Sequence, residues 1–202
     1  MSYRTILVHL DTGERRRQRL DLAFILAEKY DAHLVGFFGL EDLVIPPAPE
    51  AAPMLLQSML EVRRKAAAAA EQEFRDKMSK EGYAAKSEWL ATLGDGFAEL
   101  QRQAKYADLV VAGQPERDGG VPPWFSRELV MAIGRPVLYV PRAGRFEDCG
   151  ERVLVPWNAS REAARALEDA VPFLQRASEA EVVTFDERDD RRLPDPDVGA
   201  FL

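Results

Sequence analysis

The chain has 202 residues, of which 47% are hydrophobic and 30% charged, an ordinary globular composition with room for one complete domain and part of a second. Its net charge of -7 argues against a nucleic-acid partner or an anionic membrane surface, because both need clustered Lys and Arg. Cys149 is the only cysteine, and no apolar run is as long as a membrane span or a signal-peptide core. We therefore expect a cytoplasmic protein without disulfides.

Apolar runs of strand length alternate along the chain with segments of helical periodicity. The predicted strands cover residues 5–10, 33–38, 87–92, 108–113 and 136–141. Apolar residues three or four apart predict three helices around 20–27, 97–104 and 129–133, and a longer helix from about Met54 that Gly82 ends. This alternation is typical of an α/β protein with a parallel sheet and helices on both faces. Ligands of such folds bind outside the carboxyl ends of the strands.

Two loops fall at that end of the predicted sheet. Residues 41–53, "EDLVIPPAPEAAP", are rich in proline and predict a surface loop, with a lid as the alternative. Residues 113–126, "GQPERDGGVPPWFS", follow a buried strand, so this stretch is either a phosphate cradle or a plain connection to the next helix.

The beginning of the sequence recurs after a polar linker. "ILVHLDTGERRRQRLDLA" (6–23) aligns without a gap to "VLVPWNASREAARALEDA" (153–170), and the same spacing matches "HLVGFF" (33–38) to "AEVVTF" (180–185). This repeat predicts a complete domain over 1–143, a linker over 144–151 and the first β-α-β unit of an incomplete second domain over 152–202. The charged residues from about 186 onward lack an apolar stripe, and we expect them to be loosely ordered.

Three segments together resemble the universal stress protein family: "ILVHLDTGERRRQRLDLA", "LGDGFAELQRQAKYADLVVAG" and "GRPVLYVP". The resemblance covers residues 3–142 as one domain and extends to the beginning of the second domain of tandem members. It implies an open doubly wound five-stranded parallel sheet of order 3-2-1-4-5. It also implies a homodimer formed through the last strand, 136–141, and in some members an adenine nucleotide at the switch point of the sheet.

The family's nucleotide pattern matches this chain only in part. By position, Asp11 matches the aspartate that ends the first strand, Gly113 the first glycine of the loop, and Ser126 its final hydroxyl residue. These three residues are the candidate cofactor-binding set, with ATP as the ligand that the resemblance implies. Glu116 and Phe125 stand where the pattern has glycine, and the later part of the loop is one residue short. A negative charge and two large side chains oppose a phosphate cradle, so the motif is degenerate.

The same residues have structural interpretations that we prefer. Asp11 and Ser126 are typical helix-capping residues, and Arg15, Arg16 and Arg17 fit a solvated helix face. The two histidines, His9 and His33, lack further ligands in a metal-binding pattern, and we expect no metal site.

Three functions remain open at this point. The preferred one is a regulatory or interaction protein in stress adaptation that binds an unknown protein partner and holds no cofactor. The alternatives are an adenine-nucleotide (ATP or AMP) sensor and a hydrolase on the same fold. No catalytic residue pattern is recognisable, so we expect no enzymatic activity.

Overall fold

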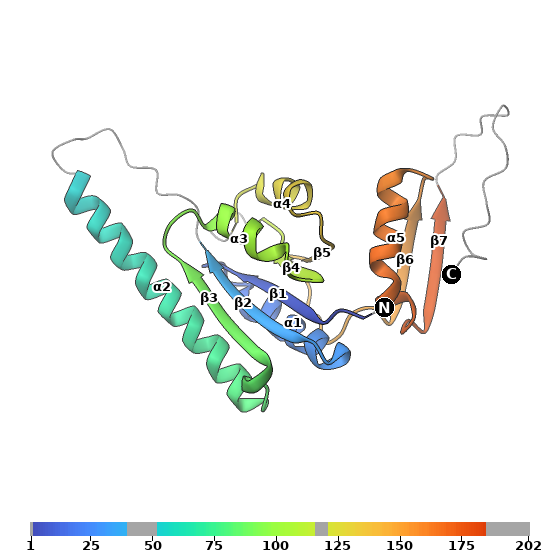
Figure 1. Ribbon diagram of the computed structural model, residues 1–202, viewed down its shortest axis with the longest axis horizontal. Helices are drawn as coiled ribbons and strands as arrows, with labels where there is room; N and C mark the ends of the chain where they lie inside the picture. Colours follow the sequence, from blue (N-terminus) through green and yellow to red (C-terminus); the bar gives the residue numbers. More distant parts are fainter. Residues whose placement is uncertain (1, 40–51, 116–120, 185–202) are drawn as a thin grey trace. The chain divides into compact units, whose positions relative to one another are not determined.

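The computed structural model describes residues 2–39, 52–115 and 121–184 (Figure 1). It divides into two compact units, one from Tyr3 to Phe146 and one that begins at Glu147. The predicted boundary between a domain ending at 143 and a linker over 144–151 stays a prediction. Most of the predicted loop over 41–53, and the tail from 186, lie outside the described residues; Ala52 and Pro53 already belong to a helix.

A five-stranded parallel sheet forms the larger unit, as predicted. Its strands follow the order β3-β2-β1-β4-β5, so the expected fold class and strand order 3-2-1-4-5 are confirmed. The strands are β1 (Thr5–Leu10), β2 (His33–Gly39), β3 (Ser87–Thr92), β4 (Leu109–Gly113) and β5 (Val137–Val140). The chain reverses its direction of winding between β1 and β4, which puts the topological switch point after the carboxyl ends of these two strands.

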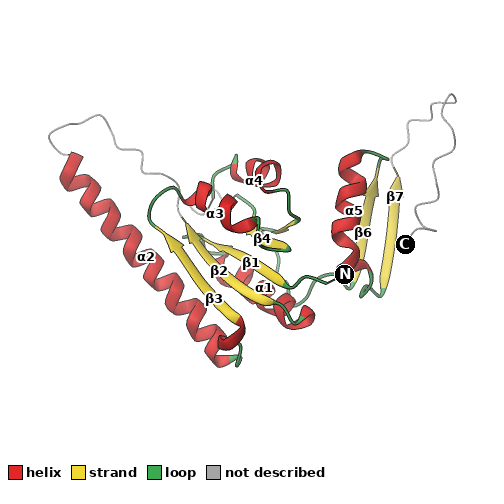
Figure 2. Cartoon of the chain, in the orientation of Figure 1, coloured by secondary structure: helices red, strands yellow, loops and turns green. Residues whose placement is uncertain are grey.

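Helices cover both faces of this sheet (Figure 2). One face packs against α1 (Arg16–Tyr30) and α2 (Ala52–Lys80), and the other against α3 (Gly96–Ala104) and α4 (Phe125–Ile133). The central strands are buried on both sides, which explains why β1 and β4 read as continuous apolar runs. A short 3-10 helix, Ala84–Lys86, precedes β3.

The long helix α2 packs closely because the sheet leaves room for it. Phe74 is buried over Gly36 of β2, where an added Cβ would lie 2.7 Å from its ring. The helix ends at Lys80, and Gly82 follows with φ +69° while the Tyr83 N–H donates to the Met78 carbonyl at 2.7 Å. The prediction that Gly82 ends this helix is therefore correct, since only glycine takes this φ readily.

The smaller unit is a single β-α-β motif. Strands β6 (Arg152–Trp157) and β7 (Glu179–Thr184) pair in parallel and are joined by α5 (Arg161–Leu174). Its register corrects the repeat alignment. Leu7 pairs with Val35 in the first sheet, yet Leu154 pairs with Glu181 and not with Val182. The second strand is thus displaced by one residue from the ungapped match, because the whole connection from β6 to β7 is one residue shorter than the connection from β1 to β2. That this motif begins a second copy of the domain stays a prediction.

Candidate functional site

The turn after β1 holds the first candidate residue, Asp11, in an unexpected way. Its carboxylate is buried, with the residue only 1% exposed, and its Oδ1 accepts the Gly13 N–H at 2.8 Å. Helix α1 begins later, at Arg16, and its N-cap residue Arg15 makes no side-chain cap. The expectation that Asp11 caps this helix is wrong, because its side chain turns inward before the helix starts.

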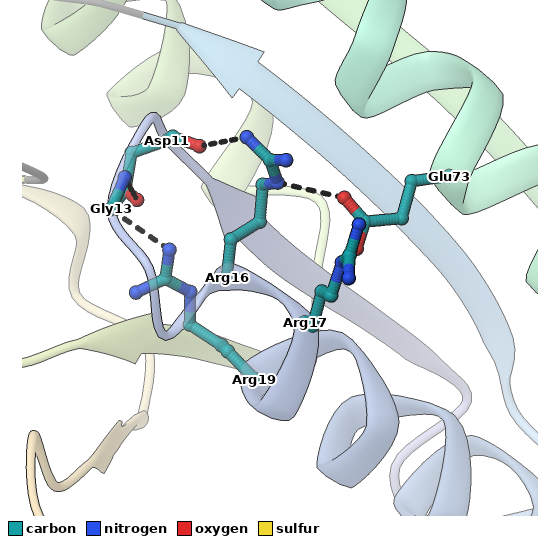
Figure 3. Close-up of polar contacts among 6 residues, drawn as sticks. All are labelled: Asp11, Gly13, Arg16, Arg17, Arg19 and Glu73. Atoms are coloured by element: carbon teal, nitrogen blue, oxygen red, sulfur yellow. Dashed lines mark hydrogen bonds and ion pairs between the residues drawn. The ribbon is translucent and has the colours of Figure 1, made fainter.

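The other oxygen of Asp11 faces an arginine of the same chain (Figure 3). Arg19, in the first turns of α1, is 1% exposed, and its Nη2 lies 2.8 Å from Asp11 Oδ2. The contact is an ion pair without hydrogen-bond alignment, and neither Nε nor Nη2 of Arg19 makes a hydrogen bond to the described residues. Burial is the largest single influence and would raise the pKa of Asp11. The Arg19 guanidinium acts together with His9 and the Gly13 hydrogen bond to hold the pKa below its ordinary value.

Gly113, the second candidate residue, is in contact with the same guanidinium. It ends β4, next to β1, and a Cβ added to it would lie 1.8 Å from Arg19 Nη1 and 3.0 Å from Cζ. The space beside Gly113 is therefore filled by Arg19. Asp11 and Gly113 come together as the sequence predicted, with an arginine between them that the sequence reasoning missed.

Ser126, the third candidate residue, lies apart from that pair in its contacts. Helix α4 begins one residue earlier, at Phe125, so Ser126 sits inside the first turn and the expectation that it caps the helix is wrong. Its carbonyl accepts the Tyr139 hydroxyl at 2.6 Å, whereas its own Oγ is buried without a hydrogen-bond partner among the described residues. Burial raises the pKa of Tyr139 to about 12, with the Ser126 bond opposing.

Phe125 fills the position at which the family pattern has glycine. Its ring is buried and stacks on His9 of β1, with 4.9 Å between ring centroids, and it also meets the edge of Phe97 at 5.7 Å. His9 is 2% exposed and its Nε2 donates to the Gly39 carbonyl at 3.3 Å. Burial lowers the pKa of His9 to about 4, against the attraction of Asp11, so the ring is neutral at physiological pH.

The arginines after the turn form a second layer around it. Arg16 donates from Nη1 to the Asp11 carbonyl at 3.2 Å and from Nε to Glu73 of α2 at 2.9 Å. Arg17 reaches the other oxygen of Glu73 at 2.6 Å, while its side chain stays 80% exposed (Figure 3). The expected solvated face is thus only partly correct, because the Arg16 side chain is largely buried between the turn and α2.

The remaining sequence expectations concern residues and ligands that these contacts do not decide. Glu116 lies outside the described residues. No cluster of three or more His, Cys, Asp or Glu side chains suited to a metal occurs within the described ranges. In the same ranges no helix is long and apolar enough to cross a membrane. Absence of a metal or a cofactor stays a prediction.

Comparison with known proteins places this fold beside the universal stress proteins. A universal stress protein from Archaeoglobus fulgidus DSM 4304 matches over 93% of this chain and 67% of its own, with TM-score 0.64 and 16% identity. The universal stress protein UspA from Lactobacillus plantarum matches over 69% of this chain and 99% of its own, with TM-score 0.52 and 20% identity. At these identities the likeness shows the fold. No protein-family model matches the sequence, and neither does any curated protein.

Proposed function

We propose that the chain is a universal stress protein-like regulatory or interaction protein whose first domain works without a bound nucleotide and without enzymatic activity. The fold shared with universal stress proteins supports the class. One observation carries the nucleotide-free state: the buried Arg19–Asp11 pair occupies the switch point beside Gly113. Its compartment, on this proposal, is the cytoplasm.

The pair removes what a nucleotide would need at this position. A phosphate cradle requires open space beside glycine backbone, and the Arg19 guanidinium takes that space at Gly113. Asp11, the family's nucleotide contact, already neutralises Arg19 and accepts the Gly13 N–H. Phe125 adds a buried ring where the pattern needs a second approach of backbone. Together these side chains occupy the space and the charged group that a nucleotide would need.

Calorimetric titration with Mg-ATP and with AMP tests the proposal on the full chain. We expect no binding at micromolar ligand concentrations, and no nucleotide in the supernatant of the denatured protein. The double variant Glu116→Gly/Phe125→Gly gives the matched comparison, because it restores the family's glycines and leaves Arg19 in place. A micromolar dissociation constant for the unchanged protein, abolished by Asp11→Ala, would overturn the proposal.

The adenine-nucleotide sensor is the second candidate, and one observation favours it. Asp11 and Gly113 follow neighbouring strands at the same edge of the sheet, where nucleotides bind in open α/β folds. The sensor function requires Arg19 to leave this position when ligand arrives. A hydrolase has less support, since the contacts around Asp11 contain no nucleophile with an adjacent base. Steady release of phosphate from ATP would be its test.

We propose a homodimer that forms through β5. This strand pairs with β4 on one side and ends the described sheet on the other, and unpaired edges recruit further strands. Val130 and Met131 on the preceding helix are large apolar residues that are 50% and 80% exposed. Light scattering should give twice the monomer mass, and Met131→Lys should weaken the dimer. Val62→Lys, at a similarly exposed site on α2, is the control.

A further inference from the structure

We infer that the switch point of the first domain is a guanidinium site, for which Arg19 is the built-in ligand, and that it accepts a free guanidinium ion once that side chain is removed. The inference builds on the proposed nucleotide-free state. Its test measures stability and needs no nucleotide, so the two can fail separately.

The chemistry of the site is that of a cation site. Its charged acceptor is the buried Asp11 carboxylate. Burial would raise the pKa of this carboxyl group, and the charge of Arg19 is the largest of the influences that lower it. His9 is neutral, and its proton is committed on Nε2 to the Gly39 carbonyl. Within the described residues Arg19 is the cation paired with this carboxylate, while Arg16 donates to the Asp11 backbone carbonyl. Once Arg19 is removed, the buried carboxylate therefore selects a positive ligand. An anionic phosphate would meet like charge here once Arg19 was displaced.

The shape of the site fits a flat guanidinium group. Gly113 does not have a positive φ, so its backbone accepts any residue, and glycine is required there only for space. Nη1 and Cζ of Arg19 lie where a side chain would begin, at 1.8 and 3.0 Å from an added Cβ. The glycine that the family resemblance assigns to a nucleotide is therefore explained by the arginine of the same domain.

The Arg19 guanidinium is attached to α1 through its side chain, and in this position two of its nitrogens make no hydrogen bond to the described residues. Its Nε and Nη2 form the edge that pairs with carboxylates through two parallel hydrogen bonds, yet neither is aligned with an acceptor among the described residues. The ion pair with Asp11 rests on proximity, at 2.8 Å. A free guanidinium ion carries no such tether, so it can turn both donors toward Asp11.

A double-mutant cycle on the full chain tests whether the Arg19 guanidinium occupies the space beside Gly113. The four proteins are the unchanged chain, Gly113→Ala, Arg19→Ala and the double variant, each followed by thermal unfolding. Gly113→Ala should lower the melting temperature by roughly 5–15 °C when Arg19 is present, because the added methyl displaces a buried ion pair. The same change should cost less than about 3 °C in Arg19→Ala. Equal losses in both backgrounds would refute the inference.

Chemical rescue tests the ligand. Guanidinium chloride at about 10 mM should raise the melting temperature of Arg19→Ala by a few degrees, through binding to the folded state alone. Urea, a neutral molecule of the same shape, should not, and neither should guanidinium stabilise the control Arg17→Ala, whose side chain is exposed. Equal responses to urea and guanidinium, or stabilisation of both Arg19→Ala and Arg17→Ala, would show that the site does not bind a guanidinium ion.

A fallback covers the case in which Arg19→Ala does not fold because Asp11 is left without its cation. Asp11→Asn/Arg19→Ala removes both charges and empties the space beside Gly113, so the Gly113→Ala comparison is repeated in that background. Guanidinium should not stabilise this neutral variant. Stabilisation there as large as in the charged variant would show that the ion binds elsewhere.

Discussion

We expect this protein to lose stability in mild acid, and replacing His9 by phenylalanine should remove most of that loss. His9 lies in β1 between Phe37 and Phe125, and its ring stacks on the latter at 4.9 Å. Burial lowers its pKa from 6.5 to about 4, Asp11 opposes that shift, and Arg19 adds to it. Phenylalanine keeps an aromatic ring in this stack and cannot take up a proton.

The sign and size follow from proton linkage. The unfolded chain binds a proton on His9 near pH 6.5, whereas the folded chain binds it only near pH 4. Between these values the unfolded state holds more protons, so the stability contribution is complete above pH 6.5 and is lost as the pH falls toward 4. A difference of this size corresponds to roughly 3 kcal/mol of unfolding free energy.

Urea unfolding at pH 7.5, 6.5, 5.5 and 4.5 measures this effect. The control variant is His33→Gln, which removes the other histidine, at the start of β2. His9→Phe loses the bond to the Gly39 carbonyl, so it starts about 1 kcal/mol lower at pH 7.5, but its unfolding free energy should then fall less across the series. If His9→Phe and the unchanged protein lose the same amount between pH 6.5 and 4.5, the buried imidazole is not the group responsible.

Three further changes test the packing, the helix end and the buried ion pair by urea unfolding. Phe125→Ala should cost about 3–5 kcal/mol, because it empties the core position next to His9; a loss below about 1 kcal/mol would mean that Phe125 is not packed as described. Gly134→Ala should cost only about 1 kcal/mol, since Gly134 ends α4 at φ +61° in open space, and a larger loss would indicate a steric contact. Asp11→Asn should cost about 3–5 kcal/mol by leaving Arg19 unpaired, and Asp11→Asn/Arg19→Met should recover much of it; without recovery, the ion pair is not the cause.

Much of the larger unit follows from its sequence. Near-continuous apolar runs such as "TILVHL" and "DLVVA" predicted central parallel strands, and spacing from Leu55 to Met78 predicted the long helix. Both signals are local and strong, since burial on two faces leaves no polar alternation. The strand order came from the family resemblance, because periodicity does not say which strands are neighbours. The repeat did not reveal the one-residue register shift at β7, because the length of the whole connection between β6 and β7 sets it and no residue pattern does.

The site was harder to predict because its deciding residue resembles a surface residue. Arg19 follows three other arginine positions in "RRRQR", which reads as a solvated helix face. Its spacing held a different signal: Arg19 precedes Ala23 by one helical turn and shares the stripe that continues to Ala27, both fully buried. A charged residue in a buried stripe needs a counter-ion, and Asp11 was already identified nearby in sequence. The motif reading assigned that aspartate to a ligand instead.

Asp11 both accepts a hydrogen bond within its turn and pairs with Arg19, and the matching turn of the smaller unit keeps only the hydrogen bond. In the sequence repeat, Asn158 matches Asp11 and Ala166 matches Arg19, so both members of the charge pair are neutral there. Asn158 Oδ1 still accepts the Ser160 N–H at 3.1 Å, as Asp11 Oδ1 accepts that of Gly13. The hydrogen bond of the turn therefore needs an oxygen and no charge. The charge of Asp11 is accounted for by Arg19, and it is this pair that separates the first turn from an ordinary strand-to-helix connection.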